Sequence, residues 1–179
     1  DLDKTIIDQM SDDKVSDGRD DAGRRQLYEE LYLPNVAVTH KQDGGMPVVY
    51  EAHPTYRNLF GQVVYSSDQG MLVTNYRLIR PGSLHAANGG YLILAAEKLL
   101  TDHYLWEALK RALKSKTLKI EHPYSDLGLM NTTTLTPQDL PLKVKVVLIG
   151  SREIYYLLQE ADPDFQEMFR VLVDFDDSL

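Results

Sequence analysis

The chain has 179 residues, of which 43% are hydrophobic and 26% charged, and it contains no cysteine. This composition is that of a globular domain long enough to bury a core, and the lack of cysteine excludes thiol catalysis and cysteine-based zinc sites. The net charge is −8, and residues 1–30 carry −5 of it. The rest of the chain is therefore nearly balanced, which argues against nucleic acid as a partner.

No apolar run approaches the roughly 18 residues that a membrane-spanning helix requires, and the first residues lack the basic and apolar regions of a signal peptide. We therefore expect no membrane partner and a cytoplasmic location. The chain begins without methionine, so we expect it to be a piece of a longer protein.

The first third of the chain mixes a polar segment with short ordered elements. Residues 11–23 are acidic and rich in Ser and Gly, which is typical of a mobile linker. Residues 24–33 have the apolar spacing of a short amphipathic helix that ends at Pro34. Three β-rich runs follow, and we expect strands within 35–40, 47–53 and 68–82.

The middle of the chain gives the strongest pattern. Gly89 and Gly90 precede the apolar run 91–94, which predicts a central parallel strand. Residues 101–122 then show helical spacing, with Leu105 and Leu109 on the apolar face.

The last third repeats this order. Residues 123–142 are rich in Pro and Thr and predict an excursion that forms a hairpin. A buried strand is expected from Val144 to Ile149, followed by a helix to residue 158, a short helix over 162–170 and a last strand over 171–179. Alternating strands and helices predict an α/β fold, with a parallel sheet covered by helices on both faces.

Ligands of such sheets bind beyond the carboxyl ends of the strands, which directs attention to Ala95, Ala96 and Glu97 and to Ser151 and Arg152. Two glycines, four apolar residues and two acids make a Walker B strand, whose acids hold Mg²⁺ and position the attacking water. Alanine occupies both acid positions here. Glu97 follows one place later, where an acid at a helix amino terminus is also favourable for purely structural reasons.

Several catalytic patterns are absent from the sequence. It has no GxxxxGK[ST] phosphate loop, no GxSxG elbow and no pair of histidines at metal-binding helical spacing. Two interpretations remain open for the basic residues that follow residue 109, the solvated face of a helix and its exit or a docking surface for an acidic partner: Lys110, Arg111, Lys114, Lys116 and Lys119. Arg170 ends a short predicted helix, where it is either an ordinary surface residue or one that reaches a neighbouring subunit.

Five segments carry a longer pattern: PVVYEAHPTYRNLFGQVVY (47–65), MLVTNYRLIRPGSLHAANGGYLILAAEKLL (71–100), WEALKRALKS (106–115), LPLKVKVVLIGSREIYYLL (140–158) and DPDFQEMFRVLVDFDD (162–177). In this order they closely resemble the AAA+ region of bacterial Lon-related ATP-dependent proteases. In that family a Walker A half lies upstream, a helical domain is inserted after it, and a Ser–Lys protease domain follows.

The resemblance implies that residues 1–34 are an acidic linker and helix from the upstream insertion and that 35–179 are an AAA+ core fragment, a partial P-loop NTPase-like sheet. It implies a Walker B-like strand at 91–96 and a sensor strand at 144–149, with Ser151 and Arg152 at its tip. Arg170 becomes a candidate for the arginine that completes a neighbour's ATP site. ATP and Mg²⁺ are the implied cofactors of the longer parent protein, and a homo-oligomeric ring and protein substrates its implied partners.

Two positions depart from the family. A basic residue is common where Ala86 stands, and an acidic or amide residue is common where Ala95 stands. The expected function is ATP-driven unfolding and delivery of protein substrates within a ring, in a parent that is a Ser–Lys peptidase, with this segment alone inactive. The alternative is a degenerate AAA+ scaffold for assembly or substrate docking that hydrolyses no nucleotide. A small-molecule α/β enzyme has only the architecture in its favour.

Overall fold

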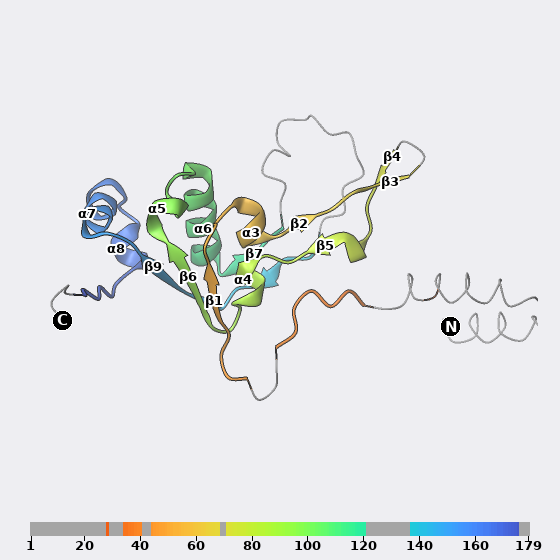
Figure 1. Cartoon of the computed structure of the whole chain (residues 1–179), viewed down its shortest axis with the longest axis horizontal. Helices are drawn as coiled ribbons and strands as arrows, with labels where there is room; N and C mark the ends of the chain where they lie inside the picture. Colours follow the sequence, from red (N-terminus) through yellow and green to blue (C-terminus); the bar gives the residue numbers. More distant parts are fainter. Residues whose placement is uncertain (1–27, 29–33, 41–43, 69–70, 121–136, 176–179) are drawn as a thin grey trace, which may run out of the picture. The chain divides into compact units, whose positions relative to one another are not determined.

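The computed structural model describes residues 28, 34–40, 44–68, 71–120 and 137–175 (Figure 1). The chain divides into two units, Asp1–Asn35 and Val36–Leu179. In the first unit Tyr28 is helical. It is the one residue of the predicted helix 24–33 that the structure describes, and the predicted linker lies outside the described residues.

The second unit alternates strands and helices. Its first part holds β1 (Val48–Glu51), α3 (Tyr56–Phe60), β2 (Gln62–Val63), β3 (Ser66–Asp68), β4 (Met71–Val73), the 3₁₀ turn η1 (Tyr76–Leu78), β5 (Ile79–Arg80) and α4 (Ser83–Ala86). Its second part holds β6 (Tyr91–Ala95), α5 (Ala96–Leu99), α6 (His103–Ser115), β7 (Thr117–Leu118), β8 (Leu140–Pro141), β9 (Lys145–Ile149), α7 (Arg152–Ala161) and α8 (Phe165–Met168).

The central feature is a three-stranded parallel sheet in the order β1-β6-β9, with β6 in the middle (Figure 1). The predicted parallel pairing of the two apolar strands is confirmed, because Leu92 pairs with Val146 and Ala95 with Ile149. The α/β fold predicted from the sequence is therefore present.

One face of this sheet packs on the helices. Leu92 and Leu94 are fully buried there, in a core to which α3, α4, α5, α6, α7 and α8 all contribute side chains. Burying a leucine side chain contributes about 2 kcal/mol, so this face supplies much of the stability of the unit.

The opposite face is open, and here the prediction of helices on both faces is wrong for the described residues. Val48, Tyr50, Val147 and Ile149 are exposed on it, and the burial along β9 alternates instead of being continuous. A strand apolar on both sides predicts two-sided burial, but burial depends on whether other parts of a protein supply a second layer.

Other expected elements change as well. Residues 35–40 and 171–175 have no strand, since β-rich residues form one only where a neighbouring edge pairs with them, and 176–179 lie outside the described residues. The run 68–82 divides into the last residue of β3, then β4, η1 and β5. The helix predicted to 122 ends at Ser115, where Lys116 adopts a left-handed conformation with φ 53°.

The predicted hairpin after α6 is present at its base. β7 and β8 pair antiparallel, with Leu118 opposite Leu140. Residues 121–136, which lie between these strands, are outside the described residues. The structure thus supports the hairpin excursion predicted from the Pro- and Thr-rich sequence.

Gly90 controls the distance between the first two strands of the sheet. A Cβ atom at this position would lie 1.9 Å from the Pro47 carbonyl oxygen, which accepts a hydrogen bond from the Tyr91 backbone N–H at 2.8 Å. Only glycine permits this approach, so Gly90 serves strand packing.

Candidate functional site

The carboxyl ends of β6 and β9 bring together the two groups of residues selected from the sequence. Ala95, the last residue of β6, is paired with Ile149, the last residue of β9. Glu97 lies in the first turn of α5, and Ser151 and Arg152 begin α7. The structure therefore brings these residues together at one edge of the sheet.

A hydrogen bond joins the two strand ends. The Ser151 backbone N–H donates to Glu97 Oε1 at 2.8 Å. Gly150 permits this contact, because a Cβ atom there would lie 2.9 Å from the Ala96 Cβ and 3.2 Å from Glu97 Oε1. Glu97 therefore holds the two strand ends together, and no hydrogen bond from the described residues uses its second carboxylate oxygen.

Ser151 caps a helix. Its Oγ accepts a hydrogen bond from the Ile154 backbone N–H at 3.4 Å, and its extended backbone starts α7. The Ser151 hydroxyl also donates a hydrogen bond to the Glu153 carboxylate, and a backbone hydrogen bond together with this one lowers the pKa of Glu153.

Arg152 points to the last described segment of the chain. Its guanidinium lies 2.5 Å from the Asp174 carboxylate, and both side chains are 64% exposed. The hydrogen bond and negative charge of Asp174 raise the pKa of Arg152. Such an exposed pair contributes little stability, so we interpret it as a local tether of the segment that follows α8.

Arg170 lies apart from this edge. Its Nε donates to the Glu167 carbonyl oxygen at 2.9 Å, and the side chain is exposed after the end of α8. Neighbouring Phe169 packs on Trp106 with a ring-centroid distance of 6.0 Å. No hydrogen bond or ion pair among the described residues joins Arg170 to Glu97 or Ser151.

Sequence reasoning missed two polar contacts, one made by Lys98 and one made by Lys110. Lys98 Nζ donates to the Ala52 carbonyl oxygen at 2.9 Å and so ties α5 to the end of β1, and no sequence signal indicates it. Lys110 was interpreted as part of a solvated or docking face, but it is buried and lies 2.8 Å from Asp162. Its position one helical turn after Trp106, within the apolar arc, could have revealed this.

These residues fit Mg²⁺ and ATP only in part. Mg²⁺ binds through one or two carboxylates, and Ala95 supplies no oxygen where the Walker B pattern needs its metal ligand. The 179 residues also contain no phosphate loop. Among the described residues no group of three His, Asp or Glu side chains could hold a metal ion.

The sequence model of the family described as "LonB-like, AAA domain" matches residues 44–176, which is more than half of the chain. The chain belongs to this family. It is similar to two curated proteins named "Putative Lon protease homolog", from Escherichia coli (strain K12) and Haemophilus influenzae. The first is 31% identical over 101 residues, 56% of this chain and 16% of the relative. The second is 37% identical over 87 residues, 46% of this chain and 13% of the relative.

The matched regions thus cover only 16% and 13% of the lengths of these two relatives. As a LonB-like AAA domain, the chain is a Lon-related protein with the partial parallel sheet expected for it. No helix among the described residues is long and apolar enough to cross a membrane.

Ala95 offers a test of the local geometry at this edge. It is the N-cap of α5, with extended backbone angles (φ −76°, ψ 116°) and no side-chain cap. We expect Ala95→Asp and Ala95→Asn to stabilise the fold by about 1 kcal/mol, because either side chain can accept a free N–H of the first turn. Urea unfolding measures the gain. Ala95→Leu, which cannot cap, is the control, and equal stability of all three variants would contradict the assigned cap.

Proposed function

We propose that this chain is the second half of the ATPase core of a cytoplasmic Lon-like ATP-dependent protease. In this proposal the domain assembles into a homo-oligomeric ring, and ATP hydrolysis with Mg²⁺ drives unfolding and delivery of protein substrates to a Ser–Lys peptidase domain elsewhere in the same polypeptide. The family membership and the shared sheet edge of β6 and β9 support it.

The observation that carries the proposal is that the parallel sheet has one exposed face and an unpaired outer edge among the described residues. Its face with Val48, Tyr50, Val147 and Ile149 is exposed, and the outer edge of β9 pairs with none of the described residues. A parallel sheet is normally covered on both faces. An upstream half that supplies the phosphate loop would complete both the sheet and the nucleotide site.

The family membership suggests the proposed roles, and the geometry of the edge is compatible with them. Ser151 and Arg152 stand where a sensor of the terminal phosphate is expected, and Glu97 holds the sensor strand against β6 through the Ser151 backbone. Arg170 is proposed to act on the nucleotide of a neighbouring subunit. Residues 1–34 are proposed to belong to the inserted helical region, and 35–179 to the core.

The second candidate function is a scaffold that assembles or docks substrates without hydrolysis. One observation favours it: Ala95 and Ala96 leave the end of β6 without the two carboxylates of an active Walker B strand. The scaffold therefore differs from the first proposal in one measurable property, which is nucleotide turnover by the longer protein.

Turnover by the longer protein separates these functions. We expect steady-state phosphate release to rise at least about tenfold in Ala95→Asp if only the metal ligand has been lost. Ala96→Glu is not a suitable partner substitution, because Ala96 is 3% exposed and a second carboxylate there would be buried near Glu97. Arg170→Ala should abolish the gain. An unchanged rate in Ala95→Asp would favour the scaffold.

The 179-residue chain alone should bind ATP weakly. It lacks the phosphate loop, its lysine and both Walker B acids, so calorimetric titration with ATP and Mg²⁺ should give no dissociation constant below roughly 10 µM, or about −7 kcal/mol. Tighter binding would show that other residues of this chain form a nucleotide site, and the proposed division into two halves would then fail.

A further inference from the structure

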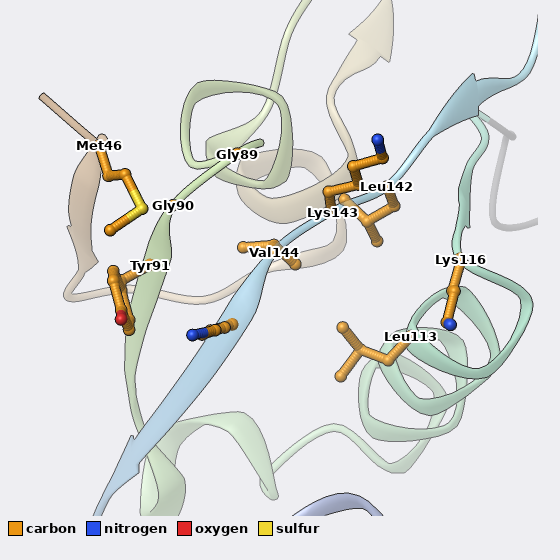
Figure 2. A pocket seen from close by; sticks show the side chains of 10 residues that line it. Met46, Gly89, Gly90, Tyr91, Leu113, Lys116, Leu142, Lys143 and Val144 are labelled. Atoms are coloured by element: carbon orange, nitrogen blue, oxygen red, sulfur yellow. The ribbon is translucent and has the colours of Figure 1, made fainter.

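A hollow lies at the amino-terminal end of the sheet, opposite the candidate nucleotide edge. Its volume is about 430 Å³. It lies between the start of β6, the start of β9 and the end of α6, and in Figure 2 Val144 and Leu113 face it from two sides. We call it the lysine pocket, because three lysines line it: Lys116, Lys143 and Lys145.

The walls of the lysine pocket are held by backbone hydrogen bonds. The Gly89 N–H donates to the Lys143 carbonyl oxygen at 2.9 Å, and the Lys145 N–H donates to that of Gly90 at 2.9 Å. The Lys143 N–H donates to Asn88 Oδ1 at 2.8 Å. The hollow is therefore formed before any ligand arrives, which lowers the entropy cost of binding.

The three lysines differ from the other lysines that surround α6. Lys110, Lys114 and Lys119 each form an ion pair with a carboxylate. None of the ion pairs among the described residues includes a lysine of the pocket. In a chain of net charge −8, this cluster is a local positive region whose charges are not neutralised by described neighbours.

The lysine pocket also has an apolar side. Leu142 is buried, and Leu113 and Val144 are partly buried and pack against the core. Lys145 Nζ lies 5.4 Å from the centre of the Tyr91 ring, which holds one ammonium group beside an aromatic surface. Cations around an apolar floor match a ligand that carries carboxylates beside an apolar side chain.

A phosphate group fits this hollow poorly. Phosphate loops bind through several free backbone N–H groups, but the N–H groups of Gly89, Gly90, Lys143 and Lys145 all donate to atoms of the protein. The pocket also has no arginine to form a paired contact with a phosphate. Separate lysine ammonium groups are better suited to carboxylates spaced along a peptide.

We propose that the lysine pocket binds an acidic segment of a protein partner. An apolar side chain of that segment occupies the space between Leu113, Leu142 and Val144, and flanking Asp or Glu carboxylates pair with the three lysines. The site is separate from the nucleotide edge, so the proposal does not depend on ATP hydrolysis. Of the two interpretations of the basic residues that follow residue 109, this proposal favours a docking surface for Lys116. It does not do so for Lys110, which is buried in an ion pair.

Binding of a defined peptide to the full 179-residue chain tests the proposal. The probe is a fluorescein-labelled octapeptide of alternating Glu and Leu, measured by fluorescence anisotropy, and its control has Gln in place of every Glu. We expect the acidic peptide to bind about tenfold more tightly at low salt. This difference should shrink as the ionic strength rises. Equal binding of both peptides would overturn the proposal.

Two triple variants locate the site. Lys116→Ala, Lys143→Ala and Lys145→Ala together should weaken binding of the acidic peptide about tenfold. The matched control removes three exposed cations elsewhere, by Arg57→Ala, Arg111→Ala and Lys119→Ala, and should change binding less than about twofold. If the control loses as much affinity, the attraction is a general effect of charge and the pocket has no special role.

A measurement on the unaltered chain does not depend on the folding of any variant. Addition of the acidic peptide to ¹⁵N-labelled protein should shift the amide resonances of Gly89, Val144 and Lys145 more than those of Glu97 and Ser151 at the opposite end of the sheet. Shifts that are absent from the pocket would overturn the proposal. Displacement of the peptide by millimolar inorganic phosphate would also overturn it, because the site would then recognise any small anion.

Discussion

Leu92→Asp is expected to leave no folded protein, whereas Val147→Asp is expected to fold. Leu92 is fully buried in the middle strand of the sheet, and Val147 is 41% exposed on the open face of β9. A buried charge without a partner costs several kcal/mol, against a total stability of about 5–15 kcal/mol for a domain. At Val147 the carboxylate remains in water, so we expect a loss below about 1 kcal/mol.

Circular dichroism and thermal unfolding of both variants measure this contrast. Leu92→Ala is the control for lost packing, and it should cost about 2–5 kcal/mol while the protein still unfolds cooperatively. A cooperative transition in Leu92→Asp at the temperature of the unaltered protein would show that β6 is not the core strand. Loss of folding in Val147→Asp would show that the open face is covered in solution.

This contrast also shows what the sequence predicts well. The four apolar residues after Gly90 identified β6, and the repeat of this pattern identified β9 as its parallel neighbour. Both patterns are local, and an apolar strand needs only that some neighbour exists. Whether a face is covered depends on segments elsewhere, which is why β9 is exposed on one side in spite of its sequence.

The same reasoning explains the strands that are absent. Residues 35–40 and 171–175 contain β-branched residues, but a strand is stabilised by hydrogen bonds and cross-strand contacts with a second strand. Val171, Val173 and Phe175 are all exposed. Propensity was therefore sufficient to suggest these strands and insufficient to form them without a neighbouring edge.

The candidate site also combines features that local sequence predicts with contacts that depend on distant segments. The meeting of Glu97 with Ser151 could be expected from two parallel strands that end at one edge, but the hydrogen bond between them depends on the close approach at Gly150. The place of Lys110 in the apolar arc of α6 indicates its burial, but that helix alone does not identify the carboxylate that pairs with it. Its carboxylate partner, Asp162, lies at the end of another helix.

That ion pair gives the second large effect that we expect. Asp162 Oδ2 lies 2.8 Å from Lys110 Nζ and accepts a hydrogen bond from Trp106 Nε1 at 2.7 Å, and the two charged side chains are 11% and 7% exposed. Asp162→Ala should destabilise the fold by about 3 kcal/mol, because it leaves both donors without this acceptor. The effect is not larger because Lys110 retains Glu107 at 2.8 Å.

Guanidinium unfolding of a double-mutant cycle with Lys110→Met isolates the pair. We expect a coupling energy of about 2 kcal/mol, since removing both charges leaves no buried lysine without its partner. Lys114→Met is the control. Its 2.5 Å pair with Asp164 is 45% and 42% exposed, and it should cost less than about 1 kcal/mol. Equal costs for Asp162→Ala and Lys114→Met would contradict the structural importance of the buried pair.

The pH dependence of Asp162→Ala provides an independent reading. Burial alone would raise the pKa of Asp162, but hydrogen bonds from Lys110, Trp106 and the Asp164 backbone outweigh burial and lower this pKa. A carboxylate with a lowered pKa in the folded state stabilises that state above its unfolded pKa of about 3.9, and this stabilisation disappears as the pH falls through the folded value. The stability difference between the two proteins should therefore be constant from about pH 5 to 8 and narrow in stronger acid. If the stability difference narrowed toward alkaline pH instead, a group other than the Asp162 carboxylate would be responsible for it.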